Sequence, residues 1–391
     1  MKVLYCNPIF LDYRIPFYKK LNELFNKNFY VLYGTNKYKG RFESTLKRIQ
    51  TEMSEMTFSF NGDHIYSTYY HKFDVITPKG YRIPITIGLL RNIRRIKPEV
   101  LITEGFFQWT PLVILYSVIF RVPVFMGYER TLYTERNKSK FTIWSRKFTN
   151  LFVAGYLVNG TETKKYLLSL GIKENKIHIG GMSADSRGLQ DAIASFPIEE
   201  KEMFRKRICK GQGLTYLVVG RVEEPKGSPY LLNAWMEHIK KHTNDRIVFI
   251  GNGDMLDEMR EKYKAESSIL LEGRIEYTNV YKYYAIADVF ILPTVNDNWS
   301  LVIPEAMSCG LPVATSIYNG CYTDLIKEGV NGFIFDTYDQ NSLIKTLDSF
   351  HYVDLKKMGE KSIEIEKEFD TEHSAIRVYN AITNYKKKYN D

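Results

Sequence analysis

Two carboxylates, Asp297 and Glu305, frame the segment of this sequence that is richest in chemical groups. The apolar run Val289–Leu292 just before them is typical of a buried parallel strand. Residues 300–307 have the composition of a helix, and Gly310 is placed to end it. Both acids would then lie near a helix N-terminus, which favours bound anions, and Glu305 is suited to a vicinal diol such as a ribose. The alternative is an ordinary surface acid and a helical glutamate.

A second motif brings two cations together after an expected strand. Residues 214–219 run into Gly220-Arg221, and Lys226-Gly227 precedes an expected helix. Arg221 and Lys226 are five residues apart on a glycine turn, so both side chains could reach one diphosphate. Two unrelated loop cations are the alternative. Their position upstream of the acidic segment favours a diphosphate site.

Together, the acidic segment and the Gly-Arg-(x)4-Lys-Gly motif resemble the family 4 retaining glycosyltransferases. In that family two acids flank a seven-residue spacer ahead of Ala-Met-x-x-Gly-x-Pro-Val, although the first acid is usually Glu and here is Asp297. The resemblance implies an α/β protein of the GT-B fold. Two Rossmann-like domains would place parallel sheets on a central cleft, and a C-terminal helix would return to the first domain. It also implies Asp297 as a catalytic residue and a donor site of Gly220, Arg221, Lys226, Arg274, Ile275, Ser300, Leu301, Val302 and Glu305.

A length of 391 residues is too great for one hydrophobic core and predicts two domains. We expect an acceptor domain over residues 1–183 and a linker over 184–210. A donor domain over 211–368 and a C-terminal helix over 369–391 should follow. The resemblance is strong over 150–391 and mainly topological before that.

Two residues of the first half are candidates for the acceptor side. Glu129 follows an expected strand and aligns with a histidine that often lies near the transferred sugar in the family. A carboxylate there could act as a catalytic base on the acceptor hydroxyl; the alternative is a structural ion pair with Arg130 or Arg136. Arg14 lies in a Tyr-Arg-x-Pro-Phe loop that resembles a subset of the family. It could bind an acceptor phosphate, or be a solvated loop arginine.

The charge of the chain is divided unevenly. Residues 1–183 carry 28 Lys/Arg against 13 Asp/Glu, and the remainder carries 26 against 32. A basic half favours an anionic partner. Because no nucleic-acid motif accompanies the charge, we expect an anionic membrane surface or a diphosphate and no nucleic acid. A basic end to the helix expected over residues 83–97 supports a membrane surface; the alternative is a basic protein that acts on a soluble glycan.

Other features limit the function further. The apolar stretch 106–126 is interrupted by two prolines and an arginine, so it predicts a buried helix and strand. The four cysteines form no Cys-x-x-Cys pair, and the start of the chain lacks a signal-peptide pattern, which favours the cytoplasm. The sequence has no Asp-x-Asp pair, so we expect no metal and no cofactor, the nucleotide sugar being a substrate.

The expected function is a retaining hexosyltransferase of cell-surface polysaccharide biosynthesis, located at the inner face of the membrane. It would move a sugar from a nucleoside-diphosphate sugar to a hydroxyl of a glycan or lipid-linked saccharide. A noncatalytic nucleotide-sugar or glycan-binding subunit on the same scaffold is the alternative.

Overall fold

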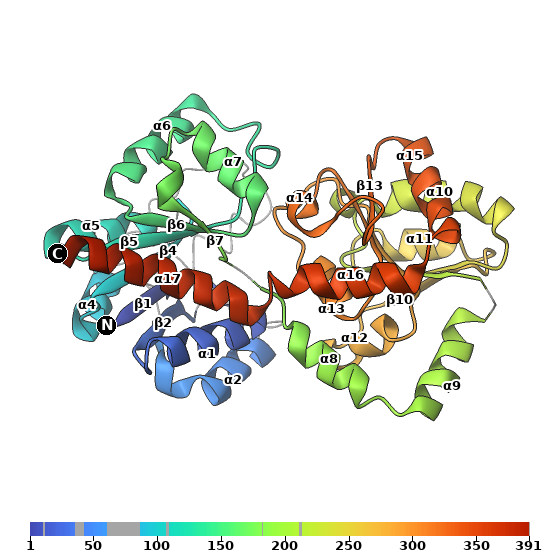
Figure 1. Ribbon diagram of the computed structural model, residues 1–391, viewed down its shortest axis with the longest axis horizontal. Helices are drawn as coiled ribbons and strands as arrows, with labels where there is room; N and C mark the ends of the chain where they lie inside the picture. The colour runs from blue at the N-terminus through green and yellow to red at the C-terminus, as the bar shows by residue number, and fades with distance from the viewer. Residues whose placement is uncertain are drawn as a thin grey trace.

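The computed structural model describes residues 1–10, 12–35, 43–60, 87–106, 109–181, 183–210 and 213–390. The chain forms two α/β lobes that lie side by side, and both termini lie on the first lobe (Figure 1). Each lobe is built around one parallel sheet.

The first sheet has the strand order β3-β2-β1-β4-β5-β6-β7, and all its neighbours pair in parallel. Its strands are β1 (Val3–Asn7), β2 (Phe29–Gly34), β3 (Thr57–Phe60), β4 (Val100–Glu104), β5 (Val124–Tyr128), β6 (Gly155–Val158) and β7 (Ile177–Ile179). Every residue of β1 and of β5 is buried. Helices cover both faces of such a sheet, so its strands are apolar runs instead of alternating patterns.

The helices of the first lobe connect these strands. They are α1 (Ile15–Leu24), α2 (Glu43–Glu52), α4 (Ile87–Ile96), α5 (Thr110–Phe120), α6 (Lys140–Thr149) and α7 (Thr161–Ser169), with the short 3-10 turns η1 (Asp12–Arg14), η3 (Ser54–Met56), η4 (Asn150–Phe152) and η5 (Glu174–Lys176). The helix expected over residues 83–97 is α4, and residues 83–86 lie outside the described part of the chain. The apolar stretch 106–126 contains α5 and the start of β5, as predicted. In the described residues, no helix combines the length and apolarity needed to cross a membrane.

The second sheet has the order β10-β9-β8-β11-β12-β13 and is also parallel. Its strands are β8 (Thr215–Val219), β9 (Arg246–Ile250), β10 (Ile269–Gly273), β11 (Val289–Leu292), β12 (Val313–Ser316) and β13 (Gly332–Phe335). Its helices are α10 (Ser228–Lys241), α11 (Leu256–Lys262), α12 (Tyr277–Tyr284), α13 (Val302–Ser308), α14 (Tyr322–Leu325), α15 (Gln340–Ser349) and α16 (Leu355–Lys367), with η6 (Glu224–Lys226) and η7 (Phe350–Tyr352).

The segment expected to be a linker, residues 184–210, folds into α8 (Ser186–Ala194) and α9 (Ile198–Cys209). Leu189 of α8 and Ile208 of α9 are buried in the same apolar cluster as Phe290 of β11. These residues therefore contribute to the core of the second lobe, and α8 lies beside α12 and α13 (Figure 1). The remaining domain limits stay a prediction.

The C-terminal helix α17 (Thr371–Asn390) runs back along the first lobe (Figure 1). Its Tyr379 ring lies 4.9 Å from the ring of Phe25, at the end of α1. Val378 and Ile382 are buried in the core of the first lobe. The helix thus joins the lobes in the way that the predicted fold class implies.

Candidate functional site

The two lobes touch in the segments that follow their strands. The backbone N–H and the hydroxyl of Thr161 donate to the Asp324 carboxylate at 2.8 and 2.6 Å. The ring of Tyr133 lies 4.9 Å from that of Tyr318, centroid to centroid. Thr161 and Tyr133 belong to the first lobe, whereas their partners belong to the second. Carboxyl ends of parallel strands therefore face each other across the lobes, which is where ligands of such sheets bind.

A hydrogen-bonded cluster of Lys226, Asp297 and Ser300 occupies this edge of the second sheet. The Lys226 Nζ donates to Asp297 Oδ2 at 2.5 Å, and the Ser300 hydroxyl donates to the same oxygen at 2.6 Å. Lys226 comes from the loop after β8 and Asp297 from the loop after β11. These strands are neighbours, and the sheet changes its strand order between them. The cluster therefore lies at the topological switch point of the second sheet.

Gly227 explains how Lys226 comes so close to Asp297. Its φ is +73°, and a Cβ at this position would lie 1.8 Å from the carbonyl oxygen of Pro293. Only glycine accepts both the positive φ and this approach. The turn between β8 and α10 therefore packs directly on the end of β11, which holds Lys226 over the loop that carries Asp297.

Asp297 does not cap α13, although aspartate is a favoured capping residue. The helix begins at Val302, and its N-cap, Leu301, makes no side-chain hydrogen bond to it. Asp297 Oδ1 instead accepts the backbone N–H of Trp299 at 3.2 Å. Asp297 therefore belongs to the loop, where its second oxygen is available to Lys226 and Ser300.

Glu305 lies in different surroundings from Asp297. Its carboxylate is buried on α13 and accepts the hydroxyls of Tyr277 at 3.2 Å and Tyr284 at 3.1 Å. Burial raises the pKa of Glu305 to about 7, although the two hydroxyls act in the opposite direction. Neither tyrosine belongs to a motif that points to this site. Their spacing of seven residues, two turns on one face of α12, is the only signal that pointed to them.

The role predicted for Glu305 has a pH-dependent test. A ribose diol donates best to an ionised carboxylate, and Glu305 gains its proton as the pH falls through about 7. Nucleoside diphosphate affinity should therefore weaken between pH 8 and pH 6, roughly one unit on either side of that pKa. Glu305→Gln should weaken binding and remove this pH dependence, as measured by isothermal titration. A 2′,3′-dideoxy nucleotide is the control, and an equal loss for it would contradict contact with the ribose.

Across the cleft, Glu129 follows β5 at the carboxyl edge of the first sheet. Its side chain reaches solvent, and its carbonyl oxygen accepts the Thr163 hydroxyl at 2.9 Å. The surrounding protein still raises the pKa of Glu129 by desolvation. The charge of Asp297 adds to this rise, while Arg14 opposes it. Asp297 belongs to the other lobe, so the charges of the two predicted catalytic carboxylates act on each other across the cleft.

The structure excludes the alternative in which Glu129 is a structural ion-pair residue. Arg130 pairs with Glu135 at 3.3 Å, and the guanidinium of Arg136 lies 3.9 Å from the Tyr133 ring centroid. Within the described part of the chain, no cation lies at ion-pair distance from Glu129. Its carboxylate is free to meet a ligand.

Arg14 is not a solvated loop arginine. Its side chain is largely buried, forms an ion pair with Glu104 and donates to the Tyr18 hydroxyl at 3.2 Å. Glu104 also accepts the Tyr5 hydroxyl at 2.5 Å. Glu104 is the last residue of β4, and Arg14 and Glu129 follow the neighbouring strands β1 and β5, which brings all three to one edge of the sheet. Contact between Arg14 and an acceptor phosphate stays a prediction.

The other predicted donor residues surround the Lys226 cluster without joining its hydrogen bonds. Arg221 is 63% exposed and pairs with Glu223 at 3.0 Å. Arg274 is also exposed and pairs with Glu276 at 3.3 Å. Both cations thus extend into solvent from loops at the carboxyl edge of the sheet. The rest lie at the end of β8 (Gly220), after β10 (Ile275) and at the start of α13 (Leu301 and Val302).

Two Rossmann-like lobes whose parallel sheets meet at a cleft, joined by a returning C-terminal helix, are the GT-B fold of glycosyltransferases. The same fold occurs in Anabaena Alr3699/HepE, solved in complex with UDP. Its TM-score is 0.77 at 13% identity, and the match covers 98% of this chain and all of that one. Residues 199–363 match the model of the glycosyl transferases group 1 family, which confirms the predicted resemblance.

Two curated relatives extend this comparison. The sulfoquinovosyl transferase SQD2 of Arabidopsis thaliana is 25% identical over 334 residues, which is 79% of this chain and 62% of that protein. The UDP-Gal:alpha-D-GlcNAc-diphosphoundecaprenol alpha-1,3-galactosyltransferase of Escherichia coli is 28% identical over 179 residues, 44% of each chain. The chain thus spans less than two thirds of the length of these relatives.

Proposed function

We propose that this protein is a retaining glycosyltransferase that moves a hexose-type sugar from a nucleoside-diphosphate sugar to a hydroxyl of a glycan or lipid-linked saccharide. One observation carries the proposal: the Lys226–Asp297–Ser300 cluster lies at the switch point of the second sheet, and Glu129 lies at the carboxyl edge of the first sheet, which meets the second across the lobes. The UDP bound in the Anabaena structure supports a nucleotide donor. The acceptor named for the Escherichia coli relative supports a lipid-linked saccharide and a role in cell-surface polysaccharide biosynthesis.

The cluster suggests how the donor binds. In this structure the cation of Lys226 is paired with Asp297. A donor diphosphate would compete with Asp297 for that cation and could draw on Arg221 as well. Negative charge grows on the diphosphate as it leaves the sugar, and a fixed cation stabilises that charge in a site sheltered from water.

Glu129 would act as the base that takes the proton of the acceptor hydroxyl. The bond between the anomeric carbon and the diphosphate oxygen breaks, and the acceptor oxygen bonds to that carbon on the same face. The hydroxyl proton passes to Glu129. A raised pKa makes this carboxylate a better base at neutral pH.

A donor screen tests the proposal directly. The purified protein is offered UDP-, GDP- and ADP-sugars with saccharide acceptors, and released nucleoside diphosphate is measured. The proposal requires release that depends on the acceptor, with a product of unchanged anomeric configuration by NMR. Nucleotide binding without turnover would instead support the noncatalytic subunit.

We further propose that the protein acts at the cytoplasmic face of an anionic membrane, without entering it. Helix α6 carries three exposed aromatic side chains at helical spacing, Phe141, Trp144 and Phe148, which are 58%, 60% and 52% exposed. The exposed cations Lys140 and Lys147 lie on the same helix. Aromatic residues beside lysines on one helix favour the boundary between lipid headgroups and acyl chains.

This surface continues toward the basic end of α4, which carries Arg91, Arg94 and Arg95. From α6 the chain passes through η4, which contacts α5, and α5 exposes Val118, Ile119 and Phe120. The guanidinium of Arg94 on α4 lies 5.8 Å from the Phe120 ring centroid. Apolar side chains bordered by cations are complementary to an anionic bilayer, whose field attracts each basic residue with about 1 kcal/mol.

Vesicle flotation tests this location. The wild type should float with anionic liposomes but not with neutral ones, and about 0.5–1 M salt should release it because screening becomes short-ranged. Replacing Arg91, Arg94 and Arg95 together by Gln should abolish flotation and preserve transfer to a soluble acceptor analogue. A wild type that stays in the soluble fraction at low salt would contradict the membrane proposal and favour a soluble glycan.

A further inference from the structure

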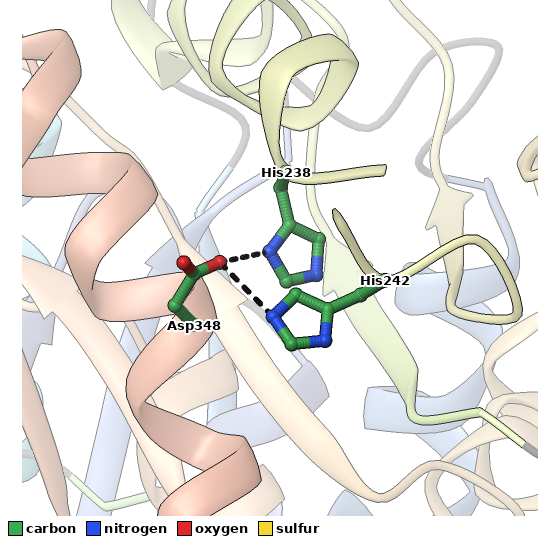
Figure 2. Close-up of side chains that lie close together, drawn as sticks. All are labelled: His238, His242 and Asp348. Atoms are coloured by element: carbon green, nitrogen blue, oxygen red, sulfur yellow. Dashed lines mark hydrogen bonds and ion pairs between the residues drawn. The ribbon is translucent and has the colours of Figure 1, made fainter. Parts of the chain in front are cut away.

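Three of the seven histidines of the chain gather on the second lobe, away from the cleft. His238 and His242 lie one turn apart near the C-terminal end of α10, and Asp348 reaches them from α15 (Figure 2). Helix α10 begins beside Lys226 and rises about 1.5 Å per residue over its 14 residues. The histidines therefore lie at the opposite end of this helix from the donor cluster, and the proposed glycosyl transfer does not use them.

The side chains of His238, His242 and Asp348 point their polar atoms at one spot (Figure 2). Asp348 Oδ1 lies 2.6 Å from His238 Nδ1 and 3.5 Å from His242 Nε2. The Nε2 atom of His242 is buried and finds no hydrogen-bond partner among the described residues. A buried polar atom without a partner is costly, so it calls for an explanation such as a bound ion.

A second layer of contacts holds these side chains in place. His238 donates from Nε2 to Asp245 Oδ2, 3.0 Å away, and that oxygen also lies 2.7 Å from His351 Nε2. The His351 ring stacks on that of His242 with centroids 3.8 Å apart. The Lys241 Nζ donates to Asp348 Oδ2 at 2.9 Å, which leaves Asp348 Oδ1 for the histidines. A carboxylate behind a histidine is the usual support of a metal-binding imidazole.

We propose that His238 Nδ1, His242 Nε2 and Asp348 Oδ1 bind a divalent transition metal ion, with zinc the best match. Two imidazoles and one carboxylate are common zinc ligands. Zinc bonds of about 2.1 Å at tetrahedral angles place ligand atoms about 3.4 Å apart. The 3.5 Å between His242 Nε2 and Asp348 Oδ1 already fits, and the closer His238 pair would open by less than about 1 Å.

The surroundings suit a cation. The site lies at the C-terminal end of α10, the negative end of its dipole, with Asp245 and Asp348 as two further negative charges. A hollow of about 480 Å³ lined by Glu237, Lys241 and Gln340, among others, opens beside His238 and Asp348. It provides an entry path and room for water as the fourth ligand. The ion would tie α10 to α15, so we assign it a structural role.

The experiment uses the full chain after dialysis against a chelator. Zinc binding is measured by isothermal titration, and cobalt substitution is followed by visible absorption, which reports tetrahedral coordination. One ion per chain should bind with micromolar or tighter affinity and should raise the thermal unfolding midpoint. Magnesium and calcium should not bind, because they prefer oxygen ligands.

Variants separate this site from others. His242→Ala and Asp348→Asn should abolish binding, the cobalt spectrum and the gain in unfolding midpoint. Asp245→Asn should weaken binding by about 10–100-fold, the usual cost of losing a supporting carboxylate. His373→Ala is the control and should bind zinc like the wild type. His373 lies on α17 and pairs with Asp370, away from the proposed site.

His351→Ala distinguishes this assignment from the neighbouring group of His238, Asp245 and His351, whose ligand atoms also lie close together. It should retain zinc binding and the cobalt spectrum, since His351 stacks on His242 and pairs with Asp245 but gives the ion no ligand atom. Loss of binding in His351→Ala with retention in His242→Ala would overturn the assignment. So would a wild type that binds no zinc.

Discussion

Replacing Glu129 by glutamine is expected to lower the rate of sugar transfer by about 10²–10⁴-fold, the usual contribution of a positioned acid–base group. Glutamine keeps the size of the side chain but cannot accept the proton of the acceptor hydroxyl. Nucleoside diphosphate affinity should be unchanged, because Glu129 lies on the opposite lobe from Lys226. Initial rates at saturating donor, together with titration calorimetry, measure both quantities.

The pH profile gives a second measurement for the same residue. The pKa of Glu129 is raised, mainly by desolvation. The protonated acid cannot act as a base, so the wild-type rate should fall as the pH drops through that pKa. The acidic limb should be absent from the residual activity of Glu129→Gln. Glu174→Gln changes an exposed acid outside the cleft and is the matched control. A Glu129→Gln variant with wild-type rate would show that another group takes the proton.

The parts of the donor site that lie close in sequence could be predicted. The strand expected at Val289–Leu292 is β11 with the same limits, because its apolar run and the proline after it are local signals. The Gly-Arg-(x)4-Lys-Gly motif likewise lies where a strand ends and a helix begins. The order of the strands then brings Lys226 to Asp297, although 71 residues separate them.

Contacts between distant segments could not be predicted in the same way. Arg14 has the pattern of a loop cation, and its burial depends on Glu104, which is 90 residues further along the chain. The two tyrosines on Glu305 come from another helix. The polar composition of residues 184–210 suggested a linker, yet a few apolar residues at helical spacing suffice to pack α8 and α9 on the second lobe.

The exposed surface of α6 and the histidine cluster could not be predicted from the sequence either. The spacing of Phe141, Trp144 and Phe148 predicts one apolar helical face, and such faces are usually buried. Only the fold shows that these side chains are exposed. His238 and His242 are one turn apart in sequence, but Asp348 joins them from a helix more than 100 residues away.

Replacing Lys226 by alanine is expected to weaken nucleoside diphosphate binding at least tenfold. A hydrogen bond to a charged group contributes about 1.5–3 kcal/mol, and about 1.4 kcal/mol corresponds to a factor of ten in affinity. In the wild type, part of this attraction is offset because the diphosphate must first displace Asp297 from Lys226. Isothermal titration measures the change, and Lys262→Ala, at an exposed lysine of the same lobe, is the control.

A double-mutant cycle with Asp297→Asn separates the two contributions. Asp297→Asn removes the carboxylate that competes with the diphosphate for Lys226, so it should strengthen nucleotide binding even though it impairs transfer. Lys226→Ala should weaken binding more in the Asp297→Asn background, because Lys226 there gives up no pair with Asp297 when it binds the diphosphate. Wild-type affinity in Lys226→Ala would remove Lys226 from the donor site. Equal losses in both backgrounds would show that the Lys226–Asp297 pair seen in the structure does not compete with the donor.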